Sequence, residues 1–400
     1  MNSGHHGILG SEALRIRKFS STLVLWLMFS CLAVPQNASR NAHSHRILPL
    51  TPFYDTPVPL PAGPPGQLIR SQSTDDFDLP EGIASWRILY HSRRGNGTDV
   101  PASAFVLAPD RKPPMGGWPV LAWAHAFSGA ARTCAPSLRR NMANGPFLIM
   151  YAQLGYAVVA PDYAGLGTSV QNAVMDMTSN ANDVIYAVAA ARAAIPDLGS
   201  RWVALGDSMG GLAALSASER ETELKDSNFL GSVAVGQIAN LNDLYTARSS
   251  SPLSPTLLAY AIKAISSQFN VRDILTDKGV SAYQQIRESY GPGPIDTTVP
   301  AQQLAKPNWE SNSSVTDFFR RNELGQVPAY RPMFILVSDE AGGVSHLSDR
   351  LVHALCKRGD RVEYTQYSVS SGTLLGSTVR DQMAWIQDRF AGRTAPSNCH

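Results

Sequence analysis

Short apolar runs recur along the chain at intervals that suit the strands of one sheet. They are rich in Val, Ile, Leu, Ala and aromatic residues, and turn-forming residues bound most of them. We predict eight strands, at Trp86–His91, Ala102–Ala108, Pro119–Ala124, Tyr156–Ala160, Trp202–Leu205, Gly231–Gly236, Met333–Val337 and Val362–Tyr367.

Helical stretches separate the later strands. Examples are the Ala-rich stretch Asn180–Ala194 and the stretch Val379–Phe390. The first strands are expected to pair antiparallel through hairpins, whereas the later ones alternate with helices. This pattern predicts an α/β fold with a mostly parallel sheet and helices on both faces.

One long segment interrupts this alternation. Residues 240–330 lie between the sixth and seventh predicted strands and contain two predicted helices, Thr256–Gln268 and Val280–Tyr290. A segment of this length without a core strand is too long for a loop. We interpret it as a helical lid inserted in a domain of residues 71–400, above the carboxyl edge of the sheet. A helical subdomain without a gating role is the alternative.

The most informative stretch follows the fifth predicted strand. Ser208 stands between Gly206 and Gly210 in a G-x-S-x-G pattern, and small and apolar residues with helical character follow. A strand, a sharp turn and a helix in this order are typical of a nucleophile elbow. Such an elbow exposes the Ser Oγ at a helix N-terminus, where N–H groups stabilise an oxyanion. Eight strands with Ser208 after the fifth match the α/β-hydrolase layout.

The N-terminal residues 1–38 predict a signal peptide. Arg15, Arg17 and Lys18 precede the apolar run Thr22–Val34, which is short for a membrane span. Residues 39–70 are rich in Pro and polar residues and read as an extended lead-in. The predicted localisation is therefore secreted, with an uncleaved anchor as the alternative.

The charge balance and the cysteine spacing limit the kinds of partner and ligand that the chain is expected to bind. The chain has 34 Lys and Arg against 32 Asp and Glu, and no basic block stands out, which weighs against nucleic acid. No pair of cysteines has metal-ligand spacing, so no metal site is predicted. In an oxidising compartment, Cys356 and Cys399 are a candidate disulfide.

Several stretches resemble the secretory lipases of the lipase-A type, a family of exported α/β-hydrolases. The resemblance extends over nearly all of the chain that follows the predicted signal peptide. It rests on Phe53 and Tyr54, Pro65–Arg70, Trp86–Tyr90, Ala122–His125, Cys134–Ser137, Leu154–Thr168, the elbow, Leu355–Tyr364 and Ala395–Cys399.

The resemblance implies hydrolysis of carboxylic esters through an acyl-enzyme on Ser208. It implies a small hydrophobic ester or lipid as substrate, transient contact with a lipid interface, and no cofactor. One oxyanion N–H falls on Met209, and the other falls on Ala126 or Phe127, where the family usually has Gly after a His. The family's C-terminal disulfide falls on Cys356 and Cys399.

The acid and the base of the triad are harder to place. In this fold the acid follows the seventh strand and the His follows the eighth. The chain offers Asp339 as the predicted acid, with Glu340 as the alternative, and a solvated acidic turn is a further reading. The family's His position holds Gly372, and the neighbouring hydroxyl residues do not titrate usefully near neutral pH.

Three hypotheses address the missing base. His346, a few residues after the candidate acid, is recruited; or the triad is lost and the fold binds a hydrophobic ligand; or the base is His125 or His400. Asp207, directly before Ser208, is a further departure, because the family usually has His there. Its charge would disfavour a developing oxyanion.

Overall fold

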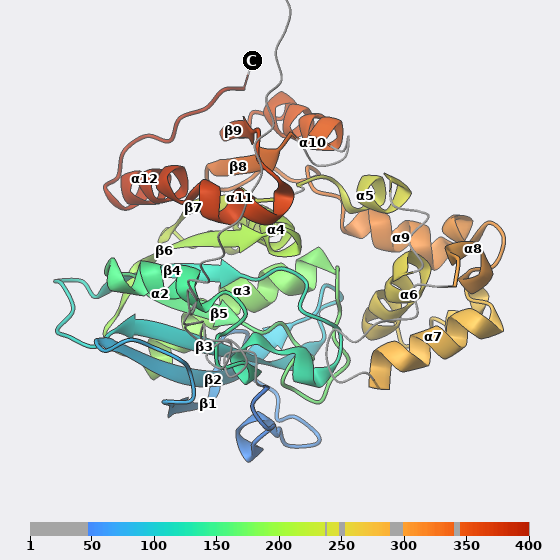
Figure 1. Cartoon of the computed structure of the whole chain (residues 1–400), viewed down its shortest axis with the longest axis horizontal. Coiled ribbons are helices and arrows are strands. Elements are labelled where there is room, and N and C mark those ends of the chain that lie inside the picture. The colour runs from blue at the N-terminus through green and yellow to red at the C-terminus, as the bar shows by residue number, and fades with distance from the viewer. Residues whose placement is uncertain (1–46, 237, 248–252, 289–298, 340–344, 400) are drawn as a thin grey trace, which may run out of the picture.

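A nine-stranded sheet forms the centre of the molecule (Figure 1). The computed structural model describes residues 47–236, 238–247, 253–288, 299–339 and 345–399. The strand order is β1-β2-β3-β5-β4-β6-β7-β8-β9. The strands are β1 Leu68–Ser73, β2 Ile83–Arg93, β3 Asp99–Pro109, β4 Trp118–Ala124, β5 Ala157–Pro161, β6 Leu198–Asp207, β7 Phe229–Val235, β8 Met333–Ser338 and β9 Val362–Tyr367.

Most strand pairs are parallel. The pairs β5–β4, β4–β6, β6–β7, β7–β8 and β8–β9 are parallel, whereas β1–β2, β2–β3 and β3–β5 are antiparallel. The predicted α/β fold class is confirmed, and the eight predicted strands correspond to β2–β9. The predicted count of eight is wrong, because β1 begins inside the stretch assigned to the lead-in. Its polar side chains are half-buried or exposed at the sheet edge, so its sequence lacks the apolar pattern of the other strands.

Helices cover both faces of the sheet. α3 (Met177–Ala194) and α4 (Met209–Leu224) pack on one face, and α2 (Gly145–Gln153) and α12 (Val379–Phe390) pack on the other. Most side chains of α3 and α4 that pack against the sheet are alanines. Because alanine is small, the two helices approach the sheet closely. The predicted Val379–Phe390 helix has the observed bounds, and α3 contains the predicted Asn180–Ala194 helix.

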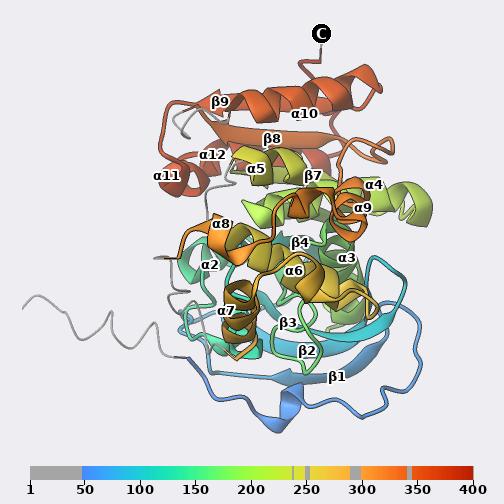
Figure 2. The ribbon, with the colours of Figure 1, turned by 90° about the vertical axis from the view of Figure 1, so that its right-hand side faces the viewer.

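The segment between β7 and β8 builds a separate helical layer. Its helices are α5 Leu241–Ala247, α6 Leu253–Ile265, α7 Asp277–Glu288, α8 Ala301–Leu304 and α9 Ser313–Arg321. An apolar core, to which α5, α6, α7 and α9 contribute together with Ala130, Ala173 and Val174, holds this layer together. The layer lies on the right of Figure 1 and towards the viewer in Figure 2. α6 and α7 correspond to the two helices predicted in this segment. None of the described helices is both long enough and apolar enough to cross a membrane.

The C-terminal tail is fixed to the last strand. The helix α10 (Ser345–Lys357) follows β8, and α11 (Ser371–Ser377) follows β9. The predicted disulfide between Cys356 and Cys399 is present and joins the tail to α10. Asn398 strengthens the attachment, because its N–H donates to the Val362 carbonyl at 3.1 Å. Single 3₁₀ turns occur at Pro52–Tyr54, Arg132–Cys134, Pro136–Leu138, Val271–Asp273 and Trp309–Ser311.

Candidate active site

Ser208 lies at the turn between β6 and α4. Its backbone has φ 54° and ψ −116°, a conformation that few non-glycine residues adopt. Its N–H donates to the Val235 carbonyl oxygen at 2.7 Å, which ties the turn to β7. The side chain is exposed. The turn therefore has the geometry of a nucleophile elbow, with an accessible hydroxyl at the start of a helix.

Three glycines permit this turn. A Cβ at Gly206 would lie 2.0 Å from the Gly210 carbonyl oxygen, and a Cβ at Gly210 would lie 1.9 Å from the Ala124 carbonyl oxygen. Gly236 has φ 123°, and a Cβ there would approach the Ser208 backbone to 3.0 Å. The backbones of β4, β6 and β7 meet this closely only because these positions carry no side chain.

Backbone N–H groups gather at the same edge of the sheet. The last residue of β4, Ala124, pairs in parallel with the glycine two residues before Ser208. Ala126 and Phe127 follow after His125, and among the described residues no acceptor is bound to their N–H groups. Met209 is the first residue of α4, where an N–H has no partner within the helix. These are the three positions predicted for oxyanion donors.

His125 is engaged by backbone carbonyls. Its Nδ1 lies 2.6 Å from the Ala126 oxygen and its Nε2 lies 3.2 Å from the Asp162 carbonyl oxygen. The ring packs on Tyr163 with centroids 4.3 Å apart. Burial lowers the pKa of His125 to about 4, so the ring is neutral at ordinary pH. This geometry contradicts the alternative in which His125 is the base, because both nitrogens face carbonyls rather than Ser208.

Asp207 brings an acidic group to the elbow. Its side chain is half-buried, and burial raises the pKa of Asp207 to about 6. The carboxyl group is therefore ionised above about pH 6. A negative charge beside the turn opposes a second negative charge on a reacting oxygen.

Asp339 follows the end of β8. Its N–H donates to the Tyr367 carbonyl at 3.1 Å, and its carboxylate accepts a hydrogen bond from the Ser368 hydroxyl at 2.6 Å. β7 separates β8 from β6, so about two strand spacings, or roughly 10 Å, lie between the Asp339 and Ser208 backbones. One imidazole bridges an interval of this order in a Ser-His-Asp arrangement. The alternative acid, Glu340, lies outside the described residues.

The expected position of the base is open. Gly372 lies in the first turn of α11, it is exposed, and a Cβ there would meet no atom within 4 Å. Its backbone is helical, so any L-residue except Pro fits there without strain.

The other two histidine candidates for the base are His346 and His400. His346 is the second residue of α10 and is exposed. The imidazole hydrogen bonds of the described chain join His91 to Asp99 and His125 to its two carbonyls, and none of them reaches Ser208. The terminal His400 lies outside the described residues. The predicted recruitment of His346 thus remains a prediction for experiment.

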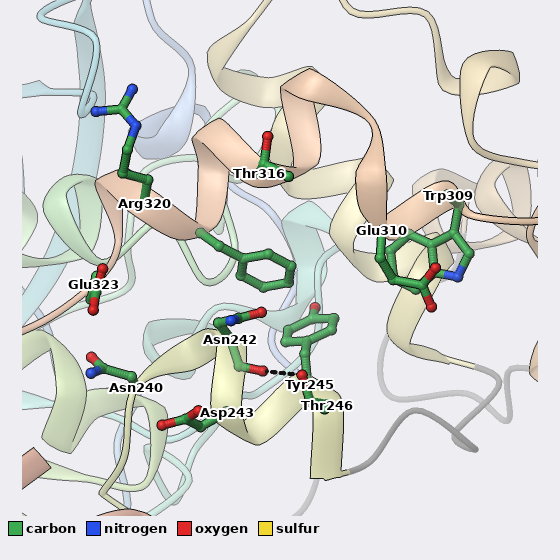
Figure 3. A pocket seen from close by; sticks show the side chains of 11 residues that line it. Asn240, Asn242, Asp243, Tyr245, Thr246, Trp309, Glu310, Thr316, Arg320 and Glu323 are labelled. Carbon is green, nitrogen blue, oxygen red and sulfur yellow. Dashed lines mark hydrogen bonds between the residues drawn. The ribbon is translucent and has the colours of Figure 1, made fainter. Parts of the chain in front are cut away.

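A separate pocket of about 520 Å³ opens within the helical layer. Its side chains come from α5, from α9 and from the 3₁₀ turn Trp309–Ser311, as Figure 3 shows. It includes Asp243, which pairs with Arg350 of α10 at 3.1 Å. Ser208 is not part of its lining. No group of three metal-ligating side chains occurs within the described ranges.

Comparison with known proteins identifies the family. The model of the family described as "Secretory lipase" matches residues 143–398, which include the elbow, Asp339 and Cys356. The chain belongs to the secretory lipase family. No curated protein matches the sequence.

Solved structures agree with the fold of this family member. Lipase A from Candida antarctica, in its closed state, is 20% identical, with 88% of this chain and 89% of that chain covered and a TM-score of 0.76. A ligand-bound form of the rice cell wall degrading esterase LipA from Xanthomonas oryzae is 16% identical. That match covers 83% of this chain and all of that chain, with a TM-score of 0.67. At these identities the likeness shows the α/β-hydrolase fold.

Sequence reasoning missed two residues that support the elbow edge of this secretory lipase. Asp162 is buried and accepts hydrogen bonds from the Ser103 and Ser137 hydroxyls, each at 2.6 Å. Tyr163 donates to the His125 carbonyl at 3.0 Å. The available signal was their position, because a polar pair directly after a buried strand lies at the carboxyl edge of the sheet.

Proposed function

We propose that this secretory lipase hydrolyses carboxylic esters through an acyl-enzyme on Ser208. The observation that carries the proposal is the exposed Ser208 hydroxyl on a turn with positive φ, near N–H groups that have no acceptor among the described residues. Oγ attacks the ester carbonyl and the alcohol leaves. Water then attacks the acyl-enzyme and releases the acid. Asp339 is the proposed acid partner of the base.

The proposed substrate is a small hydrophobic ester or a lipid. Met209, next to the nucleophile, and Met175 are both partly exposed, and both pack against the core of the helical layer. The Tyr245 hydroxyl of α5 lies 3.0 Å from Met175 Sδ, which fixes this contact. Flexible thioether side chains suit an apolar acyl chain of varied shape. Residues 240–330 are the proposed lid, and residues 1–38 the proposed secretion signal.

A second candidate is a catalytically impaired member that binds a hydrophobic ligand. The open position at Gly372 favours it, because Ser is a weak nucleophile without a base. Members of this type retain about 10³–10⁴-fold catalysis over water from binding and the oxyanion hole. Slow ester hydrolysis is therefore compatible with both candidates, and the Ser208 dependence of the reaction separates them.

The test uses the secreted protein and a series of p-nitrophenyl esters of increasing acyl length, beside Ser208→Ala. We expect turnover and fluorophosphonate labelling that both disappear in Ser208→Ala. Equal turnover in the two proteins, with no labelling, would overturn the proposal and favour the ligand-binding candidate. The acyl length with the highest kcat/KM then defines the substrate class.

A further inference from the structure

The peptide bond between Ala126 and Phe127 is held by a buried ring. The Ala126 carbonyl oxygen of this peptide lies 2.6 Å from His125 Nδ1. A trans peptide is planar, and its C=O and N–H point in opposite directions. The Phe127 N–H therefore points away from the His125 ring, and it has no acceptor among the described residues.

The preceding peptide bond has the reverse orientation. The His125 carbonyl oxygen lies 2.7 Å from the position of a Cβ on Gly210, so it faces the first turn of α4. The Tyr163 hydroxyl donates to the same oxygen at 3.0 Å. The Ala126 N–H, on the opposite side of this peptide, therefore points away from α4 and Ser208.

The sheet order supports the same assignment. β4 lies between β5 and β6, so the chain after β4 has the Asp162 end of β5 on one side and the elbow on the other. His125 Nε2 faces the Asp162 carbonyl, which places the ring on the β5 side. Because the Ala126 carbonyl oxygen points to this ring, the Phe127 N–H points to the β6 side.

We infer that the Phe127 N–H is the second oxyanion donor beside the Met209 N–H, and that His125 is the positioning residue that aims it. The inference rests on the proposed reaction at Ser208. A neutral imidazole carries one N–H, and the shorter contact, at 2.6 Å, assigns it to Nδ1. His125 thus touches no reacting atom and acts only through the peptide that it holds.

The kinetic test compares His125→Leu, which removes the donor, with His125→Asn, which keeps an N–H near the Nδ1 position. We expect His125→Leu to lower kcat about 100-fold with KM changed less than about threefold, as for loss of one oxyanion donor. His125→Asn should stay within about tenfold of the wild type. Equal losses in both variants, or full activity in His125→Leu, would overturn the inference.

A conservative substitution distinguishes the two candidate N–H groups if His125→Leu does not fold. Tyr163→Phe removes the hydroxyl that fixes the His125 carbonyl, and hence the Ala126 N–H, but leaves the Ala126 carbonyl bound to the ring. We expect kcat within about threefold of the wild type. A loss of about 100-fold would make the Ala126 N–H the donor and overturn the assignment.

An NMR measurement that does not depend on turnover tests the role of His125 independently of the proposed function. Labelling Ala with ¹³C at the carbonyl and Phe with ¹⁵N selects two peptide bonds, Ala126–Phe127 and Ala104–Phe105 in β3. In His125→Leu the Phe127 amide signal should move, whereas the Phe105 signal should not, and His125→Asn should restore the former. An unmoved Phe127 signal would overturn the role of His125. Turnover that is equal in wild type and Ser208→Ala would instead overturn the proposed function.

Discussion

The candidate site has a nucleophile half, around Ser208 at the ends of β4 and β6, and an acid–base half, at the ends of β8 and β9. The contacts that fix the two halves differ in number. On the β4–β6 side, the elbow, its glycines and the peptides after β4 are fixed by contacts that leave little freedom. On the β8–β9 side, Asp339 is exposed and accepts a hydrogen bond from one described side chain, Ser368, and a Cβ on Gly372 would meet no atom within 4 Å. The nucleophile half thus has a defined backbone geometry, whereas no imidazole of the described residues is hydrogen-bonded to Ser208 or Asp339.

This difference shows that the two halves depend on different properties of the chain. The nucleophile half consists mainly of backbone groups, so it follows from the strand order and from Gly at three positions. The acid–base half consists of side chains, so the residue at a single position, such as Gly372 at the start of α11, decides whether that position supplies an imidazole. The fold and the backbone part of the site do not depend on that residue.

The largest expected effect tests the rigidity of the nucleophile half. In Gly210→Ala the new methyl group would lie 1.9 Å from the Ala124 carbonyl oxygen, so the elbow must open. We expect fluorophosphonate labelling to disappear and the free energy of unfolding to fall by several kcal/mol. Gly376→Ala is the control. It places a methyl in open space in α11, so labelling should persist and stability should rise by up to about 1 kcal/mol. Normal labelling in Gly210→Ala would contradict the close contact.

An intermediate effect is expected from the charge beside the elbow. Because burial raises the pKa of Asp207 to about 6, the group is mostly neutral at pH 5 and ionised at pH 8. Asp207→Asn should leave kcat/KM unchanged at pH 5 and raise it about fivefold at pH 8. That ratio corresponds to roughly 1 kcal/mol between two charges in a partly buried site. The ratio of variant to wild type over pH 5 to 9 measures this effect, and a flat ratio would show that the charge does not reach the reacting oxygen.

The smallest effect is expected from substitution of His346, the histidine that one hypothesis recruits as the base. His346 is exposed and forms no hydrogen bond to Ser208 within the described chain, so His346→Ala should change kcat/KM by less than about threefold. His353→Ala, on the same helix, is the matched control. If His346→Ala fell to the rate of Ser208→Ala while His353→Ala did not, His346 would be the base and the acid–base half would be complete.

The sequence predicted the backbone features better than the side-chain features. The elbow was recognisable because Gly206, Ser208 and Gly210 are close in sequence and each has a local geometric reason. Strand β1 was missed because edge strands need no apolar pattern. The role of His125 was equally hidden, since it depends on Tyr163 and on the neighbouring ends of β4 and β5. Spacing in the sequence carries no information on which carbonyl a ring nitrogen meets.

The central claim is that the nucleophile half is competent and that the imidazole is the missing part. The most direct measurement is kcat/KM for a p-nitrophenyl ester in Gly372→His, compared with Gly376→His on the same exposed helix. Both positions are exposed, and a Cβ at either would meet no atom within 4 Å. We predict a gain of about 10²–10⁴-fold in Gly372→His, the usual contribution of a positioned general base, and no gain in Gly376→His. Equal rates in Gly372→His and the wild type would contradict the claim.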